Sequence, residues 1–525
     1  MLERNPAHLF RWLFDSRYGS PGRLVPRWIF LRALAAIYFS AFYSLLFQIK
    51  GLMGPQGILP AQDYLVAVAQ SYSDARYLYA PSVFWLSASS AALMTVTWIG
   101  LTAAVAAFFN LWPRLCFSVC FVCFLSFVST ASVFSNYQSD GMLLEAGFIA
   151  LFFVPSGIWP GLGAHSPPSR ASLFLLLWEW FRIYFESGVV KLLSGDVEWR
   201  NLTAMDEYYQ NGPLPTWIGW YVEHLPHWFH AASAGGTLVL ELGIVWMLFF
   251  PRRVRLICFF IVTPWEIGVI LTANYTFLNY LVLSLGILLL DDRALRSLVP
   301  QRFRRAEEGE TVRPPLRWLR GAFTSLSVGV AALMLTWVGY DTTAELLAMA
   351  QIPLPVGPVE ILAPFRIANQ YGLFANMTRG RYEIEFQGSM DGNTWVPYTF
   401  RYKPQALNEA PGIYAPYQPR FEWNLWFASL GDWEQNDMVP LTEEKLLANN
   451  PDVLALFKGN PFEKEPPHQV RAVLWQYWFT SMDEKRITGN WWRRELLGVY
   501  APVLANTLGG KPTVVAYPDE LPPHD

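Results

Sequence analysis

Long apolar runs separated by short polar or basic stretches occupy the first two thirds of the chain. A bilayer core about 30 Å thick requires about 20 mostly apolar residues per crossing helix. Seven runs meet this rule, and two shorter ones are compatible with tilted, flank-extended or re-entrant helices. The seven are residues 28–47, 88–109, 115–134, 171–193, 235–250, 254–272 and 322–338, and the shorter two are 142–154 and 277–290. The pattern predicts a polytopic α-helical membrane protein with about nine transmembrane helices.

The character of the sequence changes at about residue 340, where charged, aromatic and proline residues mix and no further span follows. Residues 381–387 and 396–402 alternate apolar with polar side chains, which is typical of half-buried strands. Asp391-Gly392 lies between the two runs and is a hairpin signal. Helical pieces are expected around 443–449 and 452–457. The second region is therefore predicted to be a soluble domain of α+β or β-rich architecture.

Lysine and arginine residues indicate the orientation of the spans, because cytoplasmic loops are enriched in them. With nine spans, the connections at 252–255 and 293–320, both rich in arginine, fall on the same side as the basic N-terminus. We therefore expect a cytoplasmic N-terminal segment (1–27), a polytopic membrane domain (28–339) with a long outer loop (194–231), and an extracytoplasmic soluble domain (340–525).

Composition supports a membrane class and argues against several others. Hydrophobic residues make up 53% of the chain and charged residues only 15%, whereas soluble domains carry about 25% charged residues. The formal net charge of −3 gives no general attraction to nucleic acid, so no nucleic-acid partner is predicted. All four cysteines lie in apolar runs, and the Cys120/Cys123 pair is flanked by phenylalanine and valine, which favours packing over redox chemistry.

Ionisable residues inside one predicted span form the main candidate for chemistry. Glu179, Arg182 and Glu186 fall within an arc of about 60° on a helix, so Arg182 can pair with both glutamates. Charges in hydrocarbon are costly and face the bundle interior. Lys191 is expected to reach the membrane interface by snorkelling. The complete candidate polar cluster is Asp140, Glu145, Glu179, Arg182, Glu186 and Lys191, and it fits either a ligand cavity or buried pairs that fix helix register.

The outer loop carries a second set of polar and aromatic residues. The candidates are Asp196, Trp199, Asp206, His227 and His230. Three histidines recur at a spacing of three residues, but Pro226 interrupts a helix there and no H-E-x-x-H pattern is present. Interfacial packing is favoured over metal binding. No G-x-S-x-G, P-loop or G-x-G-x-x-G pattern occurs either, so no metal and no cofactor is predicted.

Several ordered motifs, distributed along nearly the whole chain, resemble the lipase maturation factor family. They include Gln48-Ile49-Lys50-Gly51-Leu52, Tyr137-Gln138-Ser139-Asp140, Trp199-Arg200-Asn201-Leu202-Thr203, Pro416-Tyr417 with Arg420, Trp423 and Trp426-Phe427-Ala428, and Asn460-Pro461-Phe462.

The resemblance implies a location, a function and partners. Members of the family reside in the endoplasmic reticulum membrane and assist the folding and assembly of secreted dimeric lipases; a bacterial member would lie in the inner membrane. The implied partners are the lipid bilayer and a secreted, lipase-like client. Candidates for contact with the client are Tyr417, Arg420, Trp423 and Trp426, because aromatic patches suit recognition of incompletely folded surfaces. For most of the tryptophans, however, a place in the domain's own core is the favoured interpretation.

A weaker resemblance covers the membrane part alone. Tyr184-Phe185, Gly188-Val189, Lys191, Asp196 and Trp199 are similar to a segment of the vitamin K-dependent carboxylase, in which a lysine acts as a base. The alternative interpretation is thus a membrane enzyme whose site lies among the intramembrane charges.

Overall fold

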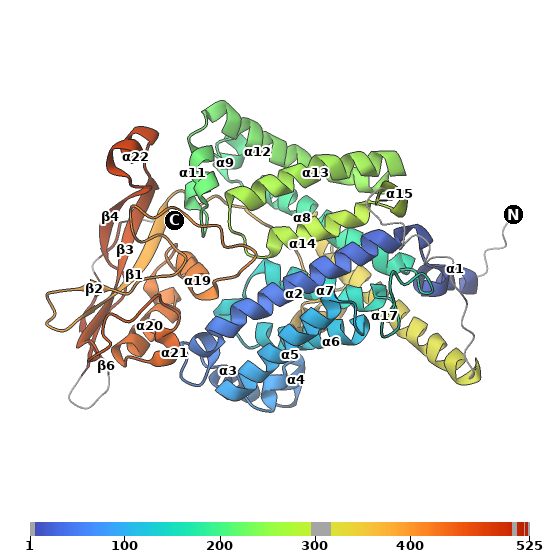
Figure 1. The fold of residues 1–525 in the computed structure, drawn as a ribbon, viewed down its shortest axis with the longest axis horizontal. Helices are drawn as coiled ribbons and strands as arrows, with labels where there is room; N and C mark the ends of the chain where they lie inside the picture. Colours follow the sequence, from blue (N-terminus) through green and yellow to red (C-terminus); the bar gives the residue numbers. More distant parts are fainter. Residues whose placement is uncertain (1–5, 296–316, 507–511, 519, 523–525) are drawn as a thin grey trace.

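The protein has a helical part and a sheet-containing part, which lie at opposite ends of its long axis (Figure 1). The computed structural model describes residues 6–295, 317–506, 512–518 and 520–522. Most of the basic connection at 293–320, on which the predicted orientation partly depends, lies outside the described residues. Helix α1 (Pro6–Phe14), the first described element, lies at the end of the helical part that is farthest from the sheet (Figure 1).

Each predicted span overlaps a helix. These helices are α2 (Leu24–Met53), α5 (Ser90–Phe108), α6 (Pro113–Val128), α7 (Gln138–Phe153), α8 (Arg170–Leu193), α12 (His227–Leu242), α13 (Arg252–Thr272), α14 (Leu278–Gly286) and α17 (Arg317–Met349). Shorter helices lie between or beside them: α1 (Pro6–Phe14), α3 (Ala61–Tyr72), α4 (Arg76–Tyr79), α9 (Val197–Asn201), α10 (Tyr208–Asn211), α11 (Trp217–Glu223), α15 (Asp292–Leu295) and α18 (Gly357–Leu362).

Within the described residues, four helical stretches are long and apolar enough to cross a bilayer. They are Pro21–Met53, Ser90–Phe108, His227–Phe249 and Arg252–Thr272. Helices α6 and α14 are apolar but shorter, and α8 is long but carries several charges. The structure thus establishes a helical region with four candidate spans, and it does not establish the predicted number of nine.

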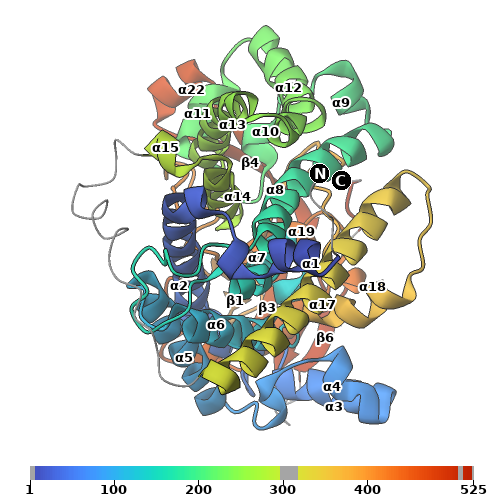
Figure 2. The same ribbon diagram turned by 90° about the vertical axis from the view of Figure 1, so that its right-hand side faces the viewer.

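Helix α8 occupies the middle of the helical part. Helices α7, α12, α14 and α17 all contact it, and Figure 2 shows α7 and α8 near the centre, with the other long helices around them. The hydroxyl of Ser169 caps α8 by accepting a hydrogen bond from the Ser172 amide at 3.2 Å, which fixes where the helix begins. Glu179, Arg182, Glu186 and Lys191 of α8 are each at most 2% exposed, so they are enclosed by protein and do not face lipid.

The C-terminal part is built on an antiparallel sheet. Its strands are β1 (Arg381–Ser389), β2 (Val396–Pro397), β3 (Gln469–Phe479), β4 (Trp492–Val499), β5 (Val503–Asn506) and β6 (Pro512–Ala516). The order is β2-β1-β3-β5-β6, and β4 also pairs with β3. Strand β1 pairs along its whole length with the central strand β3, from Arg381 opposite Tyr477 to Ser389 opposite Gln469.

The predicted hairpin is present, but its second strand is much shorter than expected. Strand β1 matches the first alternating run, whereas β2 ends at Pro397. The expectation of a strand through residues 398–402 is therefore wrong. The backbone amides there have other partners: that of Phe400 donates to the Gln405 side chain at 3.0 Å, and those of residues 401–403 all donate to the carboxylate of Glu422 at 2.6–2.8 Å. They therefore do not pair with a neighbouring strand.

Short helices fill the space between the sheet and the long helices. They are α19 (Arg420–Ala428), α20 (Met438–Leu447) and α21 (Pro451–Leu454), while α22 (Met482–Thr488) lies between β3 and β4. Helix α20 overlaps the helical piece expected around 443–449 but begins five residues earlier, and α21 covers only the first half of the piece expected around 452–457. Helix α19 packs on β1, α20 packs on β3, and α21 packs on α2, so the two parts of the molecule are in direct contact (Figure 1).

Gly51 tests the contact between α2 and α21. A Cβ atom at this position would lie 2.5 Å from the carbonyl oxygen of Asp452 and 2.9 Å from Leu456. We expect Gly51→Ala to destabilise the protein by about 1–3 kcal/mol because the added methyl group forces the backbones apart. Thermal unfolding of the full-length protein in detergent measures the change.

Gly236 in α12 supplies the matched control. A Cβ atom there meets no heavy atom within 4 Å, so Gly236→Ala should be neutral or stabilise the helix by up to about 1 kcal/mol. Equal melting temperatures for the two variants would contradict the close approach of α21 to α2.

Candidate functional site

Arg182 lies at the centre of the polar cluster in α8. Its guanidinium forms an ion pair with Glu145 of α7 and lies 3.8 Å from Glu186, one turn along α8. It also donates a hydrogen bond to the carbonyl of Asn369 at 2.6 Å. All three charged side chains are fully buried. Two carboxylates and a carbonyl therefore share one arginine, away from water.

A segment that precedes β1 completes this cluster. Residues 369–377, called here the docking segment, lie against α7 and α8. The Tyr371 amide donates to Glu186 at 2.6 Å and the Tyr371 hydroxyl to Glu145 at 2.8 Å. The Leu373 amide donates to Ser187 at 3.2 Å. Buried charges need such partners, and here they come from a segment about 180 residues further along the chain.

Lys191 is buried and paired. Its ammonium group is 2.9 Å from both carboxylate oxygens of Glu241 in α12 and 3.0 Å from the carbonyl of Leu373, and the side chain is only 2% exposed. The expectation that Lys191 snorkels to the interface is therefore wrong. A carboxylate on the neighbouring helix holds the lysine inside the protein.

Glu179 departs from its predicted pairing. It is fully buried, and it forms no ion pair with Arg182 within the described part of the chain. Both of its carboxylate oxygens lack a hydrogen-bond partner there. The side chain of Arg182 is directed at Glu145 of the adjacent helix, so a shared helix face does not produce contact between residues 179 and 182.

Asp140 and Arg420 join the helical part to the C-terminal part. The two side chains form a bidentate ion pair at 2.7 and 2.8 Å, and Arg420 also donates to the carbonyl of Phe134 at 2.6 Å. Both residues are buried. Bidentate geometry is the strongest arrangement of such a pair. The contact fixes α19 to the beginning of α7.

The other residues predicted to contact a client also lie at this junction. Tyr417 is half-buried and receives a hydrogen bond from Gln48 at 3.2 Å. Trp423 and Trp426 are 7% and 8% exposed, and the Trp426 indole donates to the carbonyl of Asn211 at 3.0 Å. A client role for the four candidates stays a prediction, because each of them now has a partner or position inside the protein.

The outer loop contacts the docking segment and encloses its end. Asp196 accepts a hydrogen bond from the Met377 amide at 2.6 Å, and the Trp199 indole donates to the carbonyl of Phe374 at 2.9 Å. Asp206 and His227 form an exposed pair at 3.0 Å. His230 is buried, and its Nε2 atom lies 2.9 Å from the carbonyl oxygen of Leu225.

Two adjoining cavities lie along these contacts. The helix cavity, of about 390 Å³, is bounded by α8, α12, α13, α14 and the outer loop, and the Lys191–Glu241 pair lies in its wall. Glu266 lines it as well, and accepts hydrogen bonds from Tyr184 at 2.5 Å and Asn279 at 2.7 Å. The interface cavity, of about 430 Å³, lies between the helices, the docking segment and α19.

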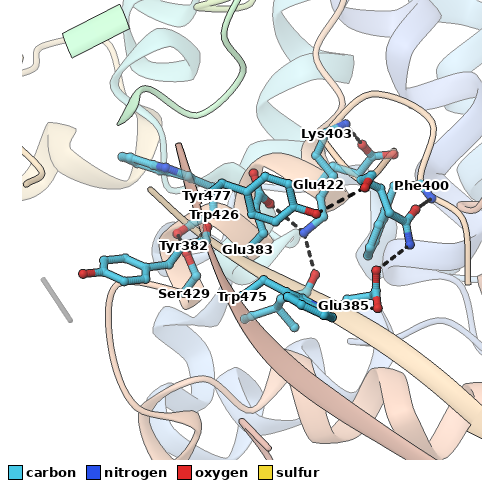
Figure 3. Close-up of polar contacts among 12 residues, drawn as sticks. Tyr382, Glu383, Glu385, Phe400, Lys403, Glu422, Trp426, Ser429, Trp475 and Tyr477 are labelled. Atoms are coloured by element: carbon cyan, nitrogen blue, oxygen red, sulfur yellow. Dashed lines mark hydrogen bonds and ion pairs between the residues drawn. The ribbon is translucent and has the colours of Figure 1, made fainter. Parts of the chain in front are cut away.

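The C-terminal part contains a second buried polar network, which the sequence did not reveal (Figure 3). Glu383 of β1 pairs with Arg381 and lies 2.7 Å from Lys403. Glu422 accepts the three backbone hydrogen bonds described above, while burial raises its pKa to about 7. The charged residues at every second position of β1 gave no signal of this network, because such alternation normally indicates a solvent-exposed face, whereas these side chains are buried.

Comparison of the sequence with known proteins identifies the family to which the chain belongs. The family model described as the lipase maturation factor transmembrane domain matches residues 25–297, and the one described as the lipase maturation factor C-terminal domain matches 367–502. The chain belongs to the lipase maturation factor family. The resemblance found in the sequence motifs is thereby confirmed.

Individual relatives match over nearly the full chain. Lipase maturation factor 2 of Gallus gallus is 30% identical over 96% of this chain and 85% of its own length. Lipase maturation factor 1 of Bos taurus is 30% identical over 93% and 91%, and that of Homo sapiens 29% identical over 93% and 90%. No solved structure matches this chain.

The two family regions meet at the polar contacts. Asp140, Glu145 and Arg182 lie in the stretch matched as the transmembrane domain, whereas the docking segment and Arg420 lie in the stretch matched as the C-terminal domain. In this family member, Arg420 of one region thus neutralises Asp140 of the other, and the docking segment supplies uncharged hydrogen-bond partners to Arg182, Glu145 and Glu186.

Replacement of Arg182 tests whether the buried carboxylates depend on its charge. Arg182→Met leaves Glu145 and Glu186 buried without their cation, so we expect a loss of about 3–5 kcal/mol in stability. The double variant Arg182→Met/Glu145→Gln should recover part of the loss. Thermal unfolding in detergent, followed by tryptophan fluorescence, measures both.

Arg486→Met is the control for this prediction. Arg486 pairs with Asp483 at 3.2 Å on an exposed helix, where both side chains are at least 78% accessible. An exposed pair contributes about 0–1 kcal/mol, so its loss should barely change the unfolding temperature. A similar small change for Arg182→Met would refute the assigned role of the arginine.

Proposed function

We propose that this chain is a membrane-bound folding and assembly factor for secreted lipases or other exported proteins. The observation that carries the proposal is the match to proteins named lipase maturation factors along both the helical and the C-terminal parts. In a eukaryotic host the protein would act at the endoplasmic reticulum membrane, and in a bacterial host at the inner membrane.

The arrangement of the molecule supports a role in which the membrane part holds the C-terminal domain in position. The C-terminal domain is not a freely tethered module, because Arg420 and the docking segment connect it to α7 and α8 through buried polar contacts. A client bound by that domain would therefore be held at a fixed position relative to the bilayer. Such positioning suits assembly of chains that emerge from the membrane.

Maturation of a lipase is the direct test. The full-length chain, produced in cells that lack their own lipase maturation factor and secrete a dimeric lipase, should raise the lipase activity per unit mass of secreted lipase. A secreted monomeric reporter in the same cells should be unaffected. Equal specific activity of the lipase with and without the chain would contradict the proposal.

The mass of the released client separates a folding factor from the alternative, a membrane enzyme related to vitamin K-dependent carboxylase. A folding factor leaves the covalent structure of the lipase unchanged, so its intact mass after deglycosylation should be the same with and without the chain. A mass difference that depends on the chain would favour the enzyme.

We further propose that the N-terminus faces the cytoplasm and the C-terminal domain the opposite side. Three arginines support this orientation: Arg23, Arg252 and Arg255 gather near the end of α14, at the end of the helical part far from the sheet. Basic residues favour the cytoplasmic side. The outer loop, by contrast, contacts the C-terminal domain, with His224 Nε2 2.9 Å from the carbonyl of Thr480.

Cysteine labelling tests this orientation, since all four native cysteines are buried. Arg253→Cys and Ile487→Cys place single thiols on exposed positions of the basic connection and of α22. In sealed vesicles with the cytoplasmic face outward, a membrane-impermeant maleimide should label Arg253→Cys at once and Ile487→Cys only after detergent is added. The reverse order of labelling would overturn the orientation.

A further inference from the structure

The helix cavity and the interface cavity adjoin each other. Tyr208, Leu278, Leu373, Phe374 and Met377 line both. The helix cavity is bounded on one side by α12 and α13, which are the least buried of the four apolar spans. The combined space thus begins among lipid-facing helices and ends at the C-terminal domain.

The helix cavity suits an alkyl chain. Its charged groups already have partners in the protein, because Lys191 pairs with Glu241 and Glu266 accepts hydrogen bonds from Tyr184 and Asn279. The remaining wall is mostly apolar. Burial of each methylene group in such a site contributes about 0.8 kcal/mol.

The interface cavity has a different chemistry. No charged side chain is among the described residues that line it. Several of its side chains, each at least nine-tenths buried, have polar atoms without a hydrogen-bond partner in the described part of the chain. These atoms are Asn211 Oδ1, Thr276 Oγ1, Gln418 Oε1 and Trp423 Nε1.

The wall of the interface cavity is neutral but polar, with tyrosine, asparagine, glutamine, serine and threonine among its residues, and such a wall suits an uncharged ligand that donates and accepts hydrogen bonds. The indole of Trp423 can only donate, the oxygens of Asn211 and Gln418 can only accept, and the hydroxyl of Thr276 does both. Buried polar groups are normally hydrogen-bonded, and leaving them without a partner is costly. A carboxylate or phosphate in this cavity would find no cation in its wall, whereas neutral hydroxyl groups match it.

We propose that the two cavities together bind a single-chain acylglycerol, with the acyl chain in the helix cavity and the glycerol hydroxyls in the interface cavity. The binding is independent of any lipase client. The chain enters between the lipid-facing helices α12 and α13, and the polar head lies against Thr276 and Trp423. The ligand thus spans the junction between the two parts of the protein.

Direct binding tests the proposal on the full-length protein in detergent. Radiolabelled monooleoylglycerol should bind with a stoichiometry near one, and more tightly than oleate or oleoyl-lysophosphatidylcholine, which carry the same chain with a charged head. Equal binding of the three lipids would overturn the assignment of the head-binding cavity.

Two glycine variants test the chain-binding cavity. Gly268 of α13 lines the helix cavity, and a Cβ atom there meets no heavy atom within 4 Å. Gly268→Leu should therefore fold normally and weaken binding at least tenfold by filling the space. Gly236→Leu, on α12, is outside the lining and is equally free of contacts, so it should bind as the unaltered protein does. Undiminished binding by a folded Gly268→Leu protein would refute the proposal.

Thr276→Val tests the head group separately. Removal of one hydrogen-bonding hydroxyl should weaken binding of monooleoylglycerol about three- to tenfold and leave binding of oleate unchanged. Equal weakening for both lipids would indicate a general structural effect and would contradict recognition of the glycerol hydroxyls. Elution on size exclusion and the unfolding temperature verify that each variant is folded.

Discussion

Charges buried among apolar helices need partners, and this requirement determines how the two parts of the chain fit together. Arg182 has carboxylates on both sides, yet the cluster is complete only with the carbonyl of Asn369 and the amide of Tyr371. Asp140 likewise depends on Arg420. Removing Arg420 would leave the buried charge of Asp140 uncompensated, and removing the docking segment would leave polar atoms of the Arg182 cluster without hydrogen-bond partners. The helical part and the C-terminal part therefore stabilise each other and are best regarded as one folding unit.

The features that sequence analysis predicted well are those set by local pattern. Apolar runs located the helices, and alternation located β1, because both depend on neighbouring residues alone. The polar face of α8 was also visible in the spacing of its charges. The partners of these charges were not. Glu179 lies on the correct face for Arg182, but the arginine is directed towards α7, and helix spacing contains no information about which neighbouring helix offers a carboxylate.

The second strand of the hairpin illustrates the same limit in the C-terminal domain. Residues 396–402 alternate as a strand would, yet a single side chain, Glu422, takes the amides of residues 401–403. That carboxylate lies about 20 residues away and is carried by a helix. The charged side of β1 was misleading for a related reason: alternation normally indicates solvent on the polar face, whereas here a loop containing Lys403 covers it.

The docking segment both supplies partners to the buried charged groups and forms part of the cavity walls. The carbonyl of Leu373 accepts a hydrogen bond from Lys191, while the side chains of Leu373 and Phe374 form part of the wall of both cavities. A displacement of the C-terminal domain large enough to reshape the cavities would therefore also remove partners from Lys191 and Arg182. Buried charges that lose their partners are costly in a low-dielectric interior. The shape of the cavities and the position of the C-terminal domain are therefore energetically linked. A ligand that fills the cavities would change the free energy of the contacts between the two parts of the protein.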